Sequence, residues 1–327
     1  MSVGIIILNY NHAVATVNCI DSIERFNTAP VKYIVVDNGS TKEGTVVTLD
    51  AWFRERFPDG YVSCTADRMT DGPLPRVTFV RNPVNSGYAV GNNIGLEQAY
   101  KDPEITDILL LNNDILFLED ILPTLKADAD DAMEKCGLIT PILLKKNGKV
   151  IDDSCARRFI GNWNLMVPFL LHRRDWFGWI TKANERRKIL EDHPELAQDN
   201  HPFPVDYPSG SCLFIPKETF RKAGGFDPDT FLYYEELILY KKLKALGCQC
   251  YCDPRLRVIH LGGNSTRMSD KAFLQKCNLE SADVFFRKYG DCSFLQKAVW
   301  AMTKAAWRVR LALKEAKAKN KLKKKAR

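Results

Sequence analysis

The chain has 327 residues, of which 45% are hydrophobic and 27% are charged, and its formal net charge is +7. These proportions are typical of a globular protein and exclude a disordered or fibrous one. The length predicts about two domains, or one large α/β domain with an appendage. No apolar run is long enough to span a bilayer, and the N-terminus lacks the basic residues of a signal peptide. We therefore expect a cytoplasmic protein whose ten cysteines are free thiols.

The first 120 residues alternate strands with helices, as a mostly parallel sheet covered by helices does. Four continuous apolar runs are typical of strands buried on both faces. These runs are Val3–Leu8, Tyr33–Val36, Val77–Val80 and Ile108–Leu111. The helices expected between and after them are Ala13–Phe26, Thr45–Phe57, Ala89–Tyr100 and Ile121–Lys135. A polar cluster follows each strand, and ligands of open α/β sheets lie beyond the carboxyl ends of the strands, so we expect a polar ligand at one sheet edge.

The pattern is less regular in the second half of the chain. Residues 145–203 form a long polar and aromatic segment, which we interpret as an insert. A strand near Gly210–Ile215, a helix near Tyr234–Leu246 and a strand near Cys248–His260 are expected next, followed by helix from about Asp270. We therefore predict a main domain over residues 1–268, with the insert at 145–203, and a helical basic extension over 269–327.

The positive charge is concentrated in this extension. Residues 297–327 hold 12 basic residues and one acid, so they carry +11 and the preceding 296 residues carry −4. A basic tail on a mildly acidic body favours contact with an anionic surface over nucleic acid held by the body. Trp300, Trp307 and Leu311 fall on one side of a helix, which suits a membrane surface, and a helix packed on the domain is the alternative.

Two motifs at the predicted strand ends suggest contacts to a phosphorylated ligand. Asp37 in the sequence DNGS can accept hydrogen bonds from a ribose hydroxyl or a base N–H, although an Asx-turn without a ligand explains the same residues. Gly87, Gly91 and Gly95 are spaced four apart, which is not the dinucleotide fingerprint. Close packing explains Gly91 and Gly95, whereas Gly87 at a helix entrance would let backbone N–H groups approach a phosphate.

A metal site is suggested by the sequence LLLNND, which leads a buried strand directly into Asp114. Mg²⁺ and Mn²⁺ bind through one or two carboxylates together with substrate phosphates, and a capping role for Asp114 is the alternative. His260 ends a predicted strand before a Gly-rich loop that contains Arg267. It is a candidate ligand of a metal or phosphate, although a lone histidine is more often structural.

A pair of acids, Glu235 and Glu236, follows the aromatic run Phe231–Tyr234 at a predicted helix start. Adjacent residues do not share a helix face, so one of the two can point into a cleft. A carboxylate beside aromatic rings can have its pKa raised toward the range of a general base. The alternative is that both acids only complement the helix dipole.

The order of these motifs resembles the family 2 glycosyltransferases, which are inverting enzymes with the GT-A fold, a nucleotide-sugar-binding α/β domain. The resemblance covers about residues 3–267 and runs through NYN, VDNGS, NSGYAVGNNIG, LLLNND, SGSCLFIP, GGFDPDTFLYYEE and IHLGGNST. The VDNGS and glycine-rich versions, together with Arg-Arg-Phe at 157–159, are similar to rhamnosyltransferase-like members that build bacterial surface polysaccharides.

The resemblance implies a role for each motif. Donor contacts would come from Asn9, Asn11, Asp37, Asn38, Asn85, Gly87, Asn92, Asn112, Asn113 and Arg267. Asp114 stands at the D-x-D position and would bind Mg²⁺ or Mn²⁺ with His260. Glu236, or its neighbour Glu235, would be the catalytic base. The chain departs from the family pattern at Asn112, where the first Asp of D-x-D is expected, and at Ile238, where an acid often follows the base.

The implied activity is inverting transfer of a sugar, with rhamnose as one candidate, from a nucleotide-diphosphate donor. The acceptor would be a hydroxyl of a cell-surface polysaccharide or a lipid-linked glycan, which would place the enzyme at the inner face of the cell membrane. A non-catalytic sugar-nucleotide-binding or scaffold protein on the same fold is the alternative. The aromatic and basic residues at 157–179 could hold the acceptor, form a lid or make a homodimer contact.

Overall fold

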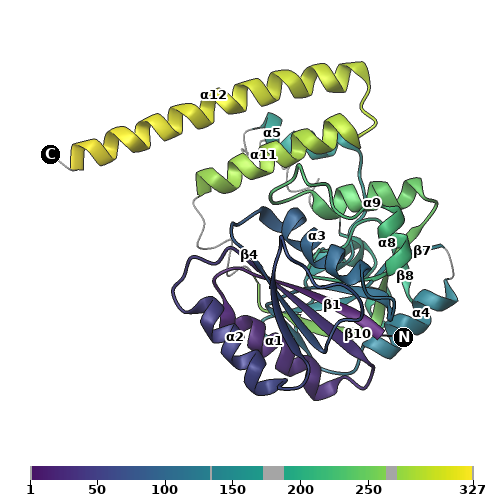
Figure 1. The fold of residues 1–327 in the computed structure, drawn as a ribbon. Helices are drawn as coiled ribbons and strands as arrows, with labels where there is room; N and C mark the ends of the chain where they lie inside the picture. The colour runs from purple at the N-terminus through teal and green to yellow at the C-terminus, as the bar shows by residue number, and fades with distance from the viewer. Residues whose placement is uncertain (1, 133–134, 172–187, 263–270, 326–327) are drawn as a thin grey trace.

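The computed structural model describes residues 2–132, 135–171, 188–262 and 271–325, and one sheet runs through the centre of this part of the chain (Figure 1). The sheet has the strand order β3-β4-β2-β1-β5-β9-β7-β10-β6, and β8 pairs with β10. The strands are β1 (Ser2–Asn9), β2 (Val31–Asn38), β3 (Tyr61–Thr65), β4 (Val77–Asn82), β5 (Ile105–Asn112), β6 (Ile115–Phe117), β7 (Cys136–Lys145), β8 (Phe203–Val205), β9 (Cys212–Pro216) and β10 (Gln249–His260).

The first five strands are parallel to one another, and β1 lies between β2 and β5. Ile6 of β1 is level with Ile34 on one side and Leu110 on the other, and all three side chains are fully buried. Strands covered by helices on both faces must be apolar at consecutive positions, which is why these strands are continuous apolar runs. The α/β fold expected from the sequence is confirmed.

Helices cover both faces of this parallel half. Side chains alternate between the faces of a strand, so odd and even positions of β1 contact different helices. Asn9 bonds Thr16 of α1, whereas Ile6 lies against Gly95 of α3. The helical elements are α1 (Ala13–Phe26), α2 (Thr45–Arg56), α3 (Gly87–Tyr100), α4 (Leu122–Asp131), η2 (Asp153–Cys155), α5 (Asn162–Leu170), α7 (Ile189–Asp192), η4 (Pro194–Gln198), α8 (Lys217–Lys222), α9 (Glu235–Ala245), α11 (Lys271–Lys288) and α12 (Phe294–Lys325).

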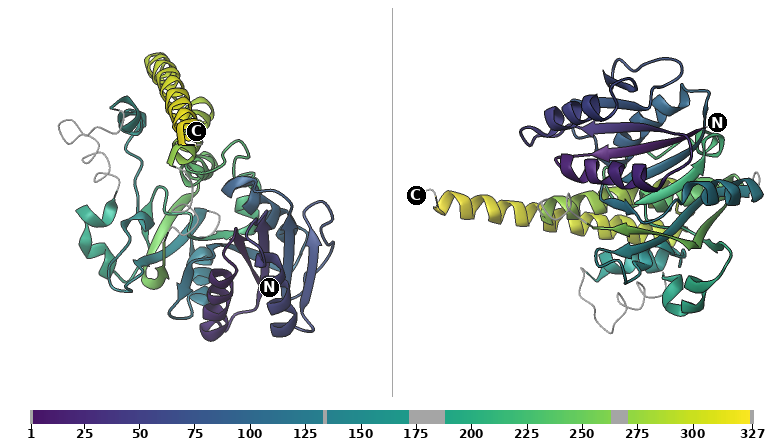
Figure 2. Two further views of the ribbon diagram at one scale, coloured as in Figure 1. Left: turned by 90° about the vertical axis from the view of Figure 1, so that its left-hand side faces the viewer. Right: turned by 90° about the horizontal axis from the view of Figure 1, so that it is seen from below.

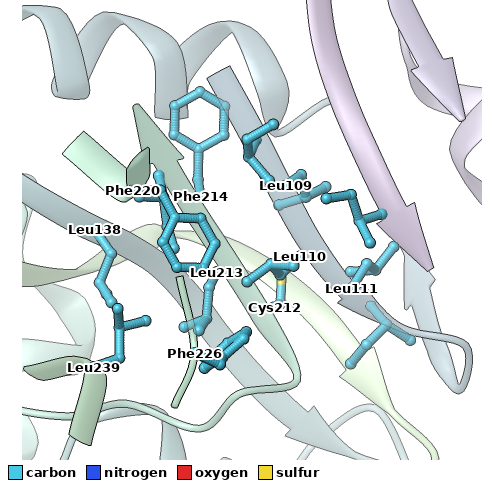
Figure 3. Packing of buried hydrophobic residues seen from close by; sticks show 14 of the residues in the cluster. Leu109, Leu110, Leu111, Leu138, Cys212, Leu213, Phe214, Phe220, Phe226 and Leu239 are labelled. Atoms are coloured by element: carbon cyan, nitrogen blue, oxygen red, sulfur yellow. The ribbon is translucent and has the colours of Figure 1, made fainter. Parts of the chain in front are cut away.

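The second half of the sheet is mixed, because β9 is antiparallel to both β5 and β7. Figure 3 shows the core at this junction, where leucines of β5 and the side chains of β9 meet Phe220 of α8 and Phe226. Phe214, Phe220 and Phe226 are each almost fully buried. This core holds β5 and β9 together, so it also fixes the positions of the residues that leave β5 at Asn112.

Most predicted elements are present, and α1 has the predicted bounds. The helix predicted over Ile121–Lys135 is too long, because α4 ends at Asp131 and the strand β7 begins at Cys136. Pro141 inside β7 cannot donate a ladder hydrogen bond, and the pairing with β10 has a register shift at this point, between Asp253 and Arg257. The 145–203 insert contains α5 and α7 among its described residues, and β8 begins at its last residue; the ten cysteines are free thiols as expected.

The C-terminal extension packs on the main domain. Figures 1 and 2 show α11 and α12 side by side, with the later part of α12 reaching beyond the rest of the chain. Trp300, Trp307 and Leu311 are at most 7% exposed, and Trp307 Nε1 donates a 2.8 Å hydrogen bond to the Phe169 carbonyl of α5. The tryptophan side of α12 is therefore a packing surface, and its assignment to a membrane surface is wrong. Within the described residues, no helix has the length and apolar character needed to cross a membrane.

Candidate active site

The carboxyl ends of β1 and β2 are joined by a buried polar network. Asp37 Oδ1 accepts hydrogen bonds from Asn9 Nδ2 at 2.7 Å and from the Ser40 hydroxyl at 2.6 Å, and the Ser40 N–H donates to Asp37 Oδ2. Asn9 accepts in turn from Thr16 Oγ1 at 3.0 Å. Asn9 and Asp37 are almost fully buried, so Asn9 fixes the orientation of the Asp37 carboxylate. The network uses three of the roughly four acceptor positions of Asp37 and leaves capacity for one further donor.

Asn11 joins two loops at the same edge. Its backbone is left-handed, with φ 62°, and its side-chain oxygen accepts 2.7 Å hydrogen bonds from the N–H groups of Thr41 and Lys42. Its own N–H donates to the Ser40 hydroxyl at 2.8 Å. The turn after β1 therefore holds the turn after β2, and both lie beside Asp37.

A second network surrounds Asn38 at the end of β2. Its Oδ1 accepts from Asn82 Nδ2 and the Ser86 hydroxyl, both at 2.9 Å, and its Nδ2 donates to Asn85 Oδ1 and the Gly87 carbonyl. These contacts fix the entrance of α3. Asn38 and Asn85, both predicted to contact the sugar-nucleotide donor, are thus brought together.

The three spaced glycines of α3 are explained by close packing. A Cβ on Gly91 would lie 2.7 Å from Leu8 Cδ1, and one on Gly95 would lie 2.6 Å from Ile6 Cγ2. Gly87, with φ +84°, lies against the Phe231 backbone, where a Cβ would be 2.4 Å from the carbonyl oxygen. Asn92, also predicted to contact the sugar-nucleotide donor, is buried, and its Nδ2 donates a 2.9 Å hydrogen bond to the Tyr88 carbonyl.

Asp114 and His260 meet at the end of β5, because β6 begins at Ile115 and pairs with the last residues of β10. Asp114 Oδ1 lies 3.5 Å from His260 Nε2, and the other ring nitrogen, Nδ1, lies 3.6 Å from Asp152 Oδ2. Asn112 is beside this pair and its N–H donates to the Ser211 carbonyl at 2.9 Å. Asn113 points the other way and donates to Thr16 Oγ1 at 3.1 Å.

Two carboxylates beside the His260 ring shift its pKa. Burial lowers the pKa of His260, but the carboxylates of Asp152 and Asp114 raise it by more, so the pKa lies above its ordinary value. The His260 ring in turn holds the pKa of Asp152 well below its usual range. Asp152 was not predicted as a site residue, because its place beside the ring follows from β7 and the turn after it.

The two glutamates occupy different environments after a strained turn. Tyr233 and Tyr234 both have left-handed backbones, with φ 76° and 70°, a conformation that is costly for residues with side chains. Glu236 Oε1 accepts a 3.0 Å hydrogen bond from the Gly210 N–H and lies 3.6 Å from Arg157 Nη2, and its side chain is 24% exposed. Glu235 is buried, and within the described residues its Oε1 has no hydrogen-bond partner. Burial, and then the charge of Glu236, raises the pKa of Glu235 to about 8.

Arg157 is held in place independently of Glu236. It donates to the carbonyls of Tyr207 and Pro208 at 3.1 and 3.0 Å, and its guanidinium lies 4.6 Å from the centre of the Tyr207 ring. The sequence placed Arg157 in an insert and gave no sign of its contact with Glu236, which is 79 positions away.

Both glutamates line a cavity of about 1120 Å³. Its polar end is formed by Asn112, Ser209, Gly210, Ser211 and Arg157. The walls from α5 and α12 are apolar, through Leu165, Pro168, Phe169 and Trp307, and we call them the apolar end. The α11 wall beside them is mixed, with Leu274 next to the polar residues Lys271, Gln275 and Asn278. The insert and the C-terminal extension, for which the sequence left several roles open, therefore both contribute walls to the cavity that contains the glutamates.

Two predictions remain outside this geometry. Arg267 lies in residues 263–270, which the structure does not describe. Residues 172–187 of the insert are not described either. Among the side chains that are described, no group of three or more His, Cys, Asp or Glu is arranged to hold a metal ion. His260 lies between Asp114 and Asp152, so the two carboxylates face different ring nitrogens.

Comparison with known proteins identifies the family. Residues 4–178 match the model of the family described as glycosyl transferase family 2. The chain belongs to this family. The resemblance to this family and the prediction of a glycosyltransferase are thereby confirmed, and a scaffold protein is not favoured.

Relatives of this glycosyltransferase include two rhamnosyltransferases. Over 247 residues the chain is 23% identical to the N-acetylglucosaminyl-diphospho-decaprenol L-rhamnosyltransferase of Mycobacterium tuberculosis, covering 72% of this chain and 68% of that protein. Over 192 residues it is 25% identical to the rhamnosyltransferase WbbL of Escherichia coli, covering 57% and 66%. The fold is shared with GalNAc-T7, solved with UDP, GalNAc and Mn²⁺, at a TM-score of 0.59 and 14% identity over 89% of this chain and 49% of that one.

Proposed function

We propose that this glycosyltransferase is an inverting, metal-dependent enzyme that moves a sugar from a nucleotide-diphosphate donor to a hydroxyl of a lipid-linked or cell-surface glycan. Rhamnose is the first candidate for the sugar, because two relatives are named as rhamnosyltransferases. The observation that carries the proposal is the accessible carboxylate of Glu236 in a cavity that also reaches Asn112, next to Asp114. We place the enzyme at the cytoplasmic face of the membrane, where lipid-linked acceptors are presented.

Glu236 is the proposed base. It takes the proton of the acceptor hydroxyl, the oxygen bonds to the anomeric carbon, and the bond from that carbon to the diphosphate breaks, with its electron pair leaving on the diphosphate. The Gly210 N–H and Arg157 hold Glu236 Oε1 in one orientation, which suits a base that must meet an incoming hydroxyl. Glu235 is the weaker candidate because it is buried and, with a pKa of about 8, mostly protonated at pH 7.

Asp114 and His260 are the proposed ligands of Mg²⁺ or Mn²⁺. One carboxylate and one imidazole fit a cation that takes its remaining ligands from a diphosphate and water, and the two side chains already converge at 3.5 Å. Such a cation stabilises negative charge on the leaving diphosphate. Asp152 fixes the His260 ring from the opposite side, as an outer carboxylate does for many metal-binding histidines.

The donor would lie along the carboxyl ends of β1, β2 and β5. Asp37 has acceptor capacity left for a ribose hydroxyl or a base N–H, with Asn9 and Asn11 holding its surroundings. Asn38, Asn85, Gly87 and Asn92 would frame the diphosphate and sugar through the entrance of α3, and Asn112, Asn113 and Arg267 would complete the site.

The acceptor would occupy the rest of the cavity. Its polar end, at Glu236 and Ser209, suits the sugar that carries the reacting hydroxyl, and its apolar end suits a lipid carrier. A diphospho-decaprenol acceptor is printed in the name of the mycobacterial relative, which supports this class of acceptor.

A donor screen tests the proposal. The protein would be incubated with dTDP-rhamnose, UDP-glucose, UDP-galactose or GDP-mannose and Mn²⁺, and release of the nucleoside diphosphate would be measured with and without a lipid-linked acceptor. We expect one donor to be turned over, EDTA to abolish the turnover, and Glu236→Gln to bind that donor while transferring on the order of 10²–10⁴ times more slowly. Donor binding without turnover in the wild type would support the scaffold alternative, and wild-type rates in Glu236→Gln would move the base elsewhere.

A further inference from the structure

The outer face of α12 carries an apolar stripe. Leu295, Met302, Val309 and Leu313 are each between 58% and 67% exposed. They are separated by seven, seven and four residues, spacings that return to nearly the same side of a helix with 3.6 residues per turn. Ala298, Ala305 and Ala306 fill the gaps between them and are exposed too. We call Leu295, Met302, Val309 and Leu313 the outer stripe.

The outer stripe is separate from the packing side of the same helix. Trp300, Thr303, Trp307 and Leu311 are at most 7% exposed. The two tryptophan rings contact Phe169 of α5, and the Trp300 ring also contacts Phe286 of α11. The two sets of residues lie on opposite sides of α12, so packing on the domain leaves the outer stripe uncovered. An α12 that served only to close the cavity would not need large apolar side chains on its outer side.

The charges near the outer stripe indicate what covers it. Lys297 and Arg308 are exposed on α12 too, but they lie nearer to the packing side than to the outer stripe. Beyond Leu313, the sequence of α12 up to Lys325 contains seven lysines and a single acid, Glu315. An apolar stripe that continues along the same helix into a lysine-rich segment is complementary to a layer of anionic headgroups above acyl chains. A second copy of this chain would instead bring the same cations together and be repelled by them.

We propose that the outer stripe of α12 docks in the interface of an anionic membrane, with α12 lying along the surface. Trp307 belongs to the packing side of the same helix and lines the apolar end of the cavity, so docking would bring that end to within one helix diameter, about 10–12 Å, of the lipid layer. A lipid-linked acceptor could then enter the cavity while its carrier stays at the membrane. This last step rests on the proposed function, whereas vesicle binding does not depend on sugar transfer.

Vesicle co-sedimentation of the full chain tests the proposal. The wild type is compared with a variant carrying Leu295→Gln, Met302→Gln, Val309→Gln and Leu313→Gln, using phosphatidylcholine vesicles with and without phosphatidylglycerol. We expect the wild type to bind the anionic vesicles. The variant should partition into them at least about tenfold more weakly, because the burial of the four apolar side chains is lost. The control variant carries Val47→Gln and Leu246→Gln, which replace exposed apolar residues away from α12. Val47 lies on α2, and Leu246 directly follows α9. This control should bind as the wild type does.

Three outcomes would overturn the proposal. The first is equal binding by the wild type and the outer-stripe variant, and the second is wild-type binding that does not need the anionic lipid. The third is a wild-type dimer in light scattering that the outer-stripe variant loses, since the stripe would then be a contact between copies of this chain. Donor binding by the outer-stripe variant should be unchanged, so a failure of docking is distinguishable from a failure of the proposed transferase activity.

Discussion

At the scale of single residues, the site depends on two neighbouring glutamates that the same turn places in different surroundings. Glu236 reaches the cavity and is held by the Gly210 N–H, whereas Glu235 is buried with one carboxylate oxygen unbonded within the described residues. Sequence reasoning could predict that adjacent residues diverge on a helix, but it could not predict which of the two is exposed. That choice is made by the left-handed backbone of Tyr233 and Tyr234, which sets the direction in which α9 begins.

The raised pKa of Glu235 predicts a pH dependence of stability. The pKa is about 8 in the folded protein, above the ordinary value of 4.5, so the unfolded chain releases this proton first as pH rises. The favourable contribution is complete below the ordinary pKa and is lost progressively up to about pH 8. We expect wild-type unfolding free energy to fall between pH 5 and 8 more steeply than that of Glu235→Gln, with a difference on the order of 3 kcal/mol.

Denaturant unfolding of the two proteins at several pH values measures this difference. Parallel curves would show that Glu235 titrates normally and is not shielded from water. Glu236→Gln is a useful comparison, because removing its charge takes away one cause of the shift while burial of Glu235, the larger cause, remains. The slope for Glu236→Gln should lie between those of the other two proteins.

At the scale of elements, the entrance of α3 is joined directly to the loop that carries the glutamates. Gly87 lies against the Phe231 backbone, and the Tyr88 N–H donates to the Phe231 carbonyl at 2.8 Å. Tyr88 also donates through its hydroxyl to the Gly210 carbonyl at 2.7 Å, next to the N–H that holds Glu236. The proposed donor loop and the proposed base are therefore parts of one packed unit.

This contact predicts a large effect of Gly87→Ala. Both Gly87 and Gly44 have left-handed backbones, so an alanine at either position carries a conformational cost of about 1–2 kcal/mol. Only at Gly87 does the added Cβ meet backbone atoms, whereas nothing lies within 4 Å of the corresponding position at Gly44. We expect Gly87→Ala to lower the unfolding free energy by about 2 kcal/mol more than Gly44→Ala does, and to reduce transfer as well. Equal losses in thermal unfolding would mean that the α3 entrance can move away from Phe231.

The elements that the sequence could predict are those whose pattern is set by burial alone. β1, β2 and β5 are continuous apolar runs because helices cover both faces, and α1 has the bounds that its sequence indicates. β7 was missed because Pro141 lies inside it and is accommodated only by the register shift in β10. The partners Arg157 and Asp152 were also missed, since sequence gives no measure of which residues meet across the insert.

At the scale of the whole molecule, the C-terminal helices pack on the main domain and form part of the wall of the cavity that holds the glutamates. Periodicity showed that Trp300, Trp307 and Leu311 share one side of a helix, but it could not show what covers that side. The structure places α5 and α11 there, so the positive charge at the end of the chain belongs to a helix whose inner side closes the cavity. The basic helix α12 thus packs on the mildly acidic main domain through Trp307.

A comparison of the two tryptophans tests whether α12 contributes to acceptor binding. Trp307→Phe removes the hydrogen bond to the Phe169 carbonyl and changes the apolar wall of the cavity, whereas Trp300→Phe removes a 2.9 Å bond to Asp283 outside the cavity. Each substitution should lower the unfolding free energy by about 1–2 kcal/mol, because it removes one buried hydrogen bond, although Asp283 keeps its bonds to Lys304 and Arg287. Only Trp307→Phe should raise the KM for a lipid-linked acceptor, with the KM for the donor unchanged. If both variants raise the acceptor KM equally, loosening of α12 explains the effect and Trp307 has no direct contact with the acceptor.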